Sequence, residues 1–181
     1  MWQIRSPAPA RLIVGILAAN KDALEAATAA LAEAFGPIDV ISQVWPFAHT
    51  DYYQDQLGPN PIRQFVSHAN LVRPDELASI KHRTNEIERS LARRLGLPWP
   101  RPVNLDPGLI ERSRLTLAST KDYCHRIYLA DGIYAEVTLV YRKGQWQDMP
   151  YTYPDYRQGH YHSFFSIVRQ RLIEQLRRQQ C

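Results

Sequence analysis

The feature that most constrains the fold is the strand predicted from Arg11 to Ala18, which is apolar without a break over residues 12–18. A strand without polar alternation is typical of a sheet that is covered on both faces. Asn20 then offers a helix N-cap, and Gly36 followed by Pro37 predicts where that helix ends. Because residues 38–44 alternate like a second strand, the chain is predicted to open with a β-α-β unit.

The rest of the chain shows further strand and helix signals. Strands are expected over residues 62–71 and 115–120, and a helix is expected between Pro74 and Gly96. The order Asp-Pro-Gly-Leu over residues 106–109 predicts a type II turn. A final helix is predicted to bury six apolar residues along one face: Tyr161, Phe164, Phe165, Val168, Leu172 and Leu176.

These elements favour the α+β class, with an antiparallel or mixed sheet and three main helices. The specific prediction is a ferredoxin-like core with an added hairpin and a C-terminal helix. Residues 1–10 contain two prolines and are expected to form a flexible leader, and residues 11–181 are expected to form a single α+β domain. At 181 residues the chain is long enough to bury a core without disulfides.

Residues 121–139 are predicted to form a β-hairpin. Asp131 and Gly132 supply its turn, because a type I′ turn requires positive φ at both central positions. A regular register around that turn sets Ile127 opposite Glu136. The hairpin therefore gathers ionisable side chains on one face and keeps the other face mostly apolar.

A candidate catalytic pair lies on the ionisable face. In this register His125 stands diagonally to Glu136, within side-chain reach, and Arg126 points to the opposite face. A carboxylate that fixes an imidazole can support acid–base chemistry, and Asp122 adds a further acidic group. The same pair can ligate a divalent metal if Asp122 or Asp106 is a third ligand, and the metal and cofactor stay open. The alternative is an ordinary solvated sheet face.

Further residues are candidates for ligand binding. Lys121 is placed to contact a phosphate, and Asn104 and Asp106 share a face if their segment is extended. Tyr153 and Arg157 lie in a tyrosine-rich loop, where aromatic rings can stack on bases or sugars. The alternatives are local capping of a turn by the acid and half-buried tyrosine anchors.

A polar stripe accompanies the second helix. Lys81, Asn85 and Glu88 lie along it beside the apolar seam. Such a stripe either lines a pocket or forms a hydrogen-bonded flank.

Charge is concentrated near the C-terminus. Residues 157–181 hold five arginines and one glutamate, which accounts for the whole net charge of +4. A polyanion would therefore meet the last helix, although Glu174 can also pair with Arg171 and Arg178 on a solvated face. Two distant cysteines favour a reducing compartment, and no apolar run is long enough for a membrane span, so a cytoplasmic protein is expected.

Several segments together resemble the bacterial family called domain of unknown function 4416. They occur in order between residues 11 and 157: Arg11–Leu17, Phe35–Asp39, Thr50–Tyr53, Asn104–Gly108, Thr120–Asp122, His125–Leu129 and Thr152–Arg157. The resemblance implies a single-domain bacterial protein and brings no catalytic residues with it. The chain departs from the family pattern just before Gly58, where it has Asp55, Gln56 and Leu57 in place of the usual methionine and acidic residue.

Two functions follow as hypotheses. The chain contains no P-loop, dinucleotide-binding, zinc-protease or nucleophile-elbow motif, so most of the familiar enzyme mechanisms are excluded. The first hypothesis is a small enzyme that acts on a phosphorylated or nucleotide-like small molecule through the cluster of His125, Glu136, Asp122 and Lys121. The alternative is a non-catalytic module that binds nucleic acid or protein through loop tyrosines and the basic C-terminal helix.

Overall fold

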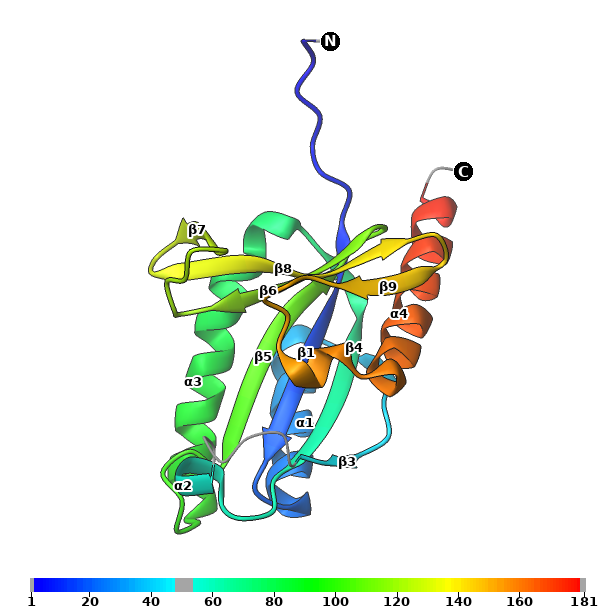
Figure 1. The fold of residues 1–181 in the computed structure, drawn as a ribbon. Helices are drawn as coiled ribbons and strands as arrows, with labels where there is room; N and C mark the ends of the chain where they lie inside the picture. Colours follow the sequence, from blue (N-terminus) through cyan, green and yellow to red (C-terminus); the bar gives the residue numbers. More distant parts are fainter. Residues whose placement is uncertain (1, 48–53, 180–181) are drawn as a thin grey trace.

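The computed structural model describes residues 2–47 and 54–179 and has one antiparallel layer of strands with helices on both faces (Figure 1). Its nine strands are β1 Ala10–Ala18, β2 Ile38–Ile41, β3 Trp45–Pro46, β4 Ile62–Val72, β5 Val103–Ile110, β6 Arg114–Ser119, β7 Ile127–Ala130, β8 Ile133–Arg142 and β9 Gln145–Asp148. Its helices are α1 Lys21–Phe35, α2 Gln54–Leu57, η2 Pro74–Glu76, α3 Leu77–Leu95, η3 Pro154–Arg157 and α4 Gly159–Arg178. The α+β class and the three main helices are thus confirmed.

The sheet has the strand order β2-β4-β1-β5-β6-β8-β7, and every pair is antiparallel. In addition, β3 pairs with β4 and β9 pairs with β8, both antiparallel. Since β4 lies between β1 and β2, and β1 lies between β4 and β5, helices α1 and α3 each cross over one inserted strand. This is the split β-α-β arrangement, and the ferredoxin-like assignment built on it stays a prediction.

Both faces of the sheet are covered, as the apolar run over residues 12–18 predicts. On one face Leu12, Val14 and Ile16 pack in a core with α1 and α3. On the other face Ile13 packs in a second core with the aromatic side of α4. All six predicted positions of α4 are buried.

The first helix has the predicted ends. Asn20 Oδ1 accepts a hydrogen bond of 2.9 Å from the N–H of Ala23, and Gly36 ends the helix with φ of 86°. The strand predicted over 38–44 is shorter and ends at Ile41, because backbone pairing continues at Ser42 only on one side: its N–H donates to the Phe65 carbonyl at 2.9 Å. There the Ser42 hydroxyl accepts the N–H of Phe65 at 2.9 Å, in place of a backbone carbonyl.

The type II turn predicted at 106–109 is wrong, because these residues lie inside β5 and pair with β1. Pro107 is tolerated since β6 pairs with β5 only from Gly108 onward, so one edge of β5 is open at the proline. Gly108 permits close strand packing: a Cβ there would lie 2.8 Å from the carbonyl oxygen of Thr116. Proline and glycine here serve strand packing and not a turn.

The hairpin turn is confirmed and its register is corrected. Asp131 and Gly132 have φ of 52° and 75°. A register shift between Tyr128 and Ala130 then sets Ile127 opposite Ala135 and not opposite Glu136. His125 and Arg126 precede β7, outside the strand.

The N-terminal segment lies outside the sheet. Residues 2–9 have no helix or strand, with Trp2 98% and Ile4 100% exposed, and β1 begins at Ala10. Across the described ranges, no helix combines the length and the apolar character that crossing a membrane requires.

Candidate functional site

The candidate site lies where β5 and β6 diverge. The two strands pair over only three residues of β5, starting at Gly108, so the preceding edge of β5 is open. Side chains from α3 satisfy the backbone there: Lys81 Nζ donates to the carbonyl of Leu105 at 2.8 Å, and Glu88 Oε1 accepts the Leu105 N–H at 2.7 Å. The gap is therefore lined by charged side chains.

The open space is a pocket of about 580 Å³. It lies between β4, β5, β6, the loop that follows β6 and the segment before α4, and it has the size of an ordinary small-molecule site. Its described lining includes five cations, which are Arg63, Lys81, Arg101, Lys121 and Arg126. It includes three carboxylates, which are Asp106, Glu136 and Asp155.

Arg63 lies at the centre of the polar side. Its side chain is 4% exposed, and Nη2 donates to Asp155 at 2.9 Å while Nη1 lies 3.4 Å from Asp106. The guanidinium also faces the rings of Phe47 at 5.2 Å and Tyr156 at 5.9 Å. Burial by itself lowers the pKa of Arg63, but Tyr156 and the two aspartates outweigh it and raise that pKa. Arg63 is a fixed positive charge.

Gly15 of β1 makes room for this arrangement. A Cβ at that position would lie 2.9 Å from Arg63 Nη1 and 3.1 Å from Tyr156 Oη. The Tyr156 hydroxyl is buried and has no hydrogen-bond partner among the residues that the structure describes. Burial, first of all, raises the pKa of Tyr156 well above its ordinary value. Tyr156 therefore lines the pocket as a neutral phenol with a donor to spare.

Asn104 and Asp106 share a face, as predicted for an extended segment. Asn104 Nδ2 donates to Asp106 Oδ2 at 2.8 Å. Burial on its own raises the pKa of Asp106, yet Lys81, Arg63 and then Asn104 more than reverse it, so the pKa lies below its ordinary value. Asp106 is thus an ionised acceptor in the pocket. The alternative of turn capping by Asp106 is wrong, because there is no turn.

The carboxylate of Glu88 holds one of the cations that line the pocket. Glu88 Oε2 accepts from Arg101 Nε at 2.8 Å, in addition to the backbone of Leu105. Burial raises the pKa of Glu88, and Arg101 and Lys81 oppose that shift. Of the polar stripe on α3, Lys81 lines the pocket and Glu88 anchors a cation that does.

The predicted His125–Glu136 pair forms, although its register was mispredicted. His125 Nε2 lies 3.2 Å from Glu136 Oε2, and the imidazole stacks on Tyr151 with ring centroids 4.2 Å apart. Glu136 is 3% exposed and also contacts the Thr138 hydroxyl at 3.2 Å. Glu136 lines the pocket, and His125 reaches the pocket only through it.

The placement predicted for Arg126 is wrong. Because the strand starts after it, Arg126 turns toward Glu136, and its Nε donates to Glu136 Oε2 at 2.8 Å. Its other nitrogens donate to Ser119 Oγ at 2.7 Å and Tyr153 Oη at 3.3 Å. The guanidinium also lies 4.7 Å from the ring centre of Tyr123. Arg126 therefore joins the loop after β6 to the loop before η3.

The structure brings together five of the eight candidate residues that the sequence singles out. They line the pocket: Glu136, Lys121, Asn104, Asp106 and Tyr153. His125 lies behind Glu136. Asp122 is exposed and does not line the pocket. The pKa of Tyr134 is raised first by the desolvation of its own hydroxyl and then by the nearby Asp122. Arg157 is also outside, where Nε and Nη2 donate to the carbonyls of Thr152 and Pro150 at 2.9 and 3.0 Å.

The loop tyrosines have different environments. Tyr151 stacks on His125, Tyr153 is 43% exposed at the pocket, and Tyr156 is buried. Tyr52 and Tyr53 lie outside the described residues. The alternative of half-buried anchors thus fits Tyr151 and Tyr156 better than a row of stacking platforms.

Sequence reasoning missed Arg63, Arg101 and Asp155. Arg63 and Arg101 stand alone in their segments, whereas Asp155 lies inside the family-like segment Thr152–Arg157 but was not singled out there. All three become part of a cluster only when β4, β5 and the segment before α4 meet. A metal site has no support within residues 2–47 and 54–179, where no group of three His, Cys, Asp or Glu side chains is arranged to hold an ion. Asp106, one of the proposed third ligands, binds Arg63 and Asn104.

Comparisons with known proteins give one match. The model of a family described as "Domain of unknown function (DUF4416)" matches residues 8–172. No curated protein matches the chain, and no solved structure does so.

Proposed function

Since the chain belongs to the DUF4416 family, whose description assigns no activity, we propose a function from its pocket: a small enzyme that acts on a phosphorylated or nucleotide-like small molecule. The observation that carries this proposal is the charge balance at the pocket. The described lining has five cations and three carboxylates, and Glu88 behind it pairs with Arg101, which leaves one cation in excess. A phosphate monoester has a charge of about −1.5 to −2 at pH 7. It would therefore neutralise the excess positive charge of the pocket.

The cations differ in how they are held. Arg63 is bound by two aspartates, and Arg126 by Glu136 and Tyr153, so both are fixed in place. Lys121 is exposed at the rim, on the segment that follows β6. We assign the first contact with a phosphate to Lys121 and Arg101, and the fixed field that favours an anion to Arg63 and Lys81.

Further polar groups in the same pocket suit the rest of such a ligand. The ionised Asp106 accepts hydrogen bonds, and the side-chain carbonyl of Asn104 can accept one from a ligand. The Tyr156 hydroxyl has no partner among the described residues. Sugar hydroxyls both donate and accept, so they match this set. A buried hydroxyl left unpaired costs about 1–3 kcal/mol, which favours a ligand that pairs with Tyr156.

The acid–base step is assigned to Glu136 with His125 behind it. An imidazole that contacts a carboxylate can exchange a proton through it, and Glu136 is the member of the pair that lines the pocket. Asp122 has no part in this assignment, because it lies outside the lining.

Binding is tested by thermal shift with ribose 5-phosphate and adenosine 5′-monophosphate, each compared with its unphosphorylated parent. At a hundred times Kd a ligand adds about 2.7 kcal/mol, or roughly 5–10 °C for a protein of this size. We expect a shift with the phosphorylated probes only. The double substitution Lys121→Ala and Arg101→Ala should reduce it, whereas Arg94→Ala, an exposed arginine on α3, should not. Equal responses in both variants would refute the site.

Chemistry is tested separately by ³¹P NMR of the same probes during incubation with the protein. Conversion that stops in Glu136→Gln, with the thermal shift retained, would support the assigned step. Binding without conversion of any phosphorylated probe would contradict the enzymatic part and leave a ligand-binding protein.

A further inference from the structure

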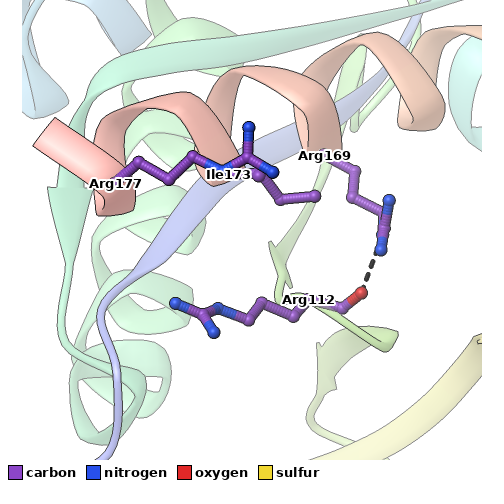
Figure 2. Close-up of a pocket in the computed structure, with 4 residues that line it drawn as sticks. All are labelled: Arg112, Arg169, Ile173 and Arg177. Atoms are coloured by element: carbon purple, nitrogen blue, oxygen red, sulfur yellow. Dashed lines mark hydrogen bonds between the residues drawn. The ribbon is translucent and has the colours of Figure 1, made fainter.

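A second cationic site lies on α4 and shares no lining residue with the pocket described above. It is a hollow of about 270 Å³, lined in the described residues by Arg112, Arg169, Ile173 and Arg177. Figure 2 shows that Arg169, Ile173 and Arg177 project from one side of α4, while Arg112 faces them from the turn between β5 and β6. Since three of the four lining residues are arginines, we propose that this hollow binds a phosphate group.

The hollow is preorganised by Arg169. Its Nε donates to the backbone carbonyl of Arg112 at 2.7 Å, and its guanidinium lies 3.7 Å from the ring centre of Tyr141 (Figure 2). These two contacts fix the arginine and leave both of its Nη atoms without an acceptor in the described part of the chain. A guanidinium held in this way loses little side-chain entropy when it binds an anion.

The positive charge of the hollow is not balanced by neighbouring acids. Glu111 is bound by Arg114, with Nη2 and Oε1 2.7 Å apart, and Glu174 accepts from Gln170 at 2.9 Å. Among the described residues no carboxylate pairs with Arg112, Arg169 or Arg177. Three guanidinium groups that surround one hollow without a counter-charge disfavour each other, and an anion relieves that repulsion.

Phosphate fits this arrangement better than a single carboxylate. It presents three oxygens and up to two negative charges, and arginine forks bind such oxygens in pairs. Ile173 adds an apolar wall between the two arginines of α4, which excludes water from one side of the bound group. The phosphate can belong to a free anion or to a nucleic-acid backbone, and the two sources are separated by experiment.

The first experiment is a ¹H–¹⁵N NMR titration with inorganic pyrophosphate and, separately, with a ten-nucleotide oligouridylate. We expect the backbone amides of residues 111–113 and 169–177 to shift. Shifts with both probes or with pyrophosphate alone identify a free-anion site, and shifts with the oligonucleotide alone identify a backbone site. Absence of shifts there with either probe, including shifts confined to the pocket at β5, would overturn the proposal.

A charge-matched pair of variants gives an independent test. Arg177→Ala removes a lining residue, and Arg171→Ala removes an exposed arginine from the same helix that does not line the hollow. Arg177→Ala is expected to weaken binding roughly tenfold and, for the oligonucleotide, to reduce the salt slope by about 1. Arg112→Ala, in the turn between β5 and β6, should weaken binding by a similar factor. Equal losses in Arg171→Ala and Arg177→Ala would show attraction by net charge alone and would overturn the site.

Discussion

The guanidinium of Arg63 on β4 and the carboxylate of Asp155 on η3 form a buried ion pair across 92 residues of sequence. Arg63 Nη2 lies 2.9 Å from Asp155 Oδ2, and the two side chains are 4% and 7% exposed. Through this pair the segment before α4 is attached to the sheet beside the pocket. The pair is therefore part of both the fold and the proposed site.

Asp155→Ala should destabilise the protein strongly. Among the described residues it would leave Asp106, at 3.4 Å, as the remaining carboxylate partner of Arg63, and removal of one partner of a buried pair costs about 3–5 kcal/mol. We expect the lower end of that range because Asp106 remains. Urea unfolding measures the loss, and Asp75→Ala, which breaks the exposed pair with Arg73, is the control that should change little. Similar losses in the two variants would contradict the role given to burial.

Gly15→Ala should damage the pocket as well as the fold. The added Cβ would lie 2.9 Å from Arg63 Nη1 and 3.0 Å from Phe65 Cε1, so the two side chains must move. Overpacking of this kind costs about 1–3 kcal/mol. The thermal shift with ribose 5-phosphate should shrink in the same variant. Gly159→Ala has open space around its Cβ and serves as the control.

Local signals in the sequence predicted most elements correctly. The apolar run of β1, the Asn20 cap and the stripe of α4 each depend on neighbours within one element, so they can be recognised without the fold. The turn expected at Pro107 and Gly108 was wrong because the reason for those residues is tertiary. The open edge of β5 and the close carbonyl of Thr116 exist only after β6 has paired.

The site was predicted only in part for the same reason. The Asp131-Gly132 turn brings His125 near Glu136, and this pair could be inferred from one hairpin. Neither the bulge between Tyr128 and Ala130 nor the start of β7 at Ile127 has a sequence signal that we recognise, and it is the start at Ile127 that leaves Arg126 outside the strand and turned toward Glu136. Arg63, Asp106 and Asp155 come from three distant segments, and only the strand order brings them together.

Gln175→Ala should loosen α4 from the sheet. Gln175 Nε2 donates to the carbonyl of Ala69 at 2.8 Å, and its Oε1 accepts from the buried Arg11 at 3.0 Å. Loss of both bonds, one of them to a charged group, is expected to lower the free energy of unfolding by about 2–3 kcal/mol. Gln170→Ala, on the exposed side of the same helix, should stay within about 0.5 kcal/mol. Denaturant unfolding of the two variants measures the difference. A small effect of Gln175→Ala would show that apolar packing alone holds α4 against the sheet.

Stability should fall in mild acid because of His68. Its side chain is fully buried, Nδ1 lies 2.9 Å from the Gly36 carbonyl, and Nε2 has no partner among the described residues. Burial lowers the pKa of His68 below its ordinary 6.5; the Gly36 bond opposes this shift, and Arg11 reinforces it.

The sign of the pH effect follows from that lowered pKa. The unfolded chain binds a proton near pH 6.5 while the folded protein resists it, so this contribution to stability is complete above pH 6.5. It is lost as the pH falls from there through the folded pKa. We expect urea unfolding between pH 8 and about 5 to show a steeper loss for the native protein than for His68→Gln, which cannot titrate at this position. Parallel curves for the two proteins would mean that His68 protonates equally in both states.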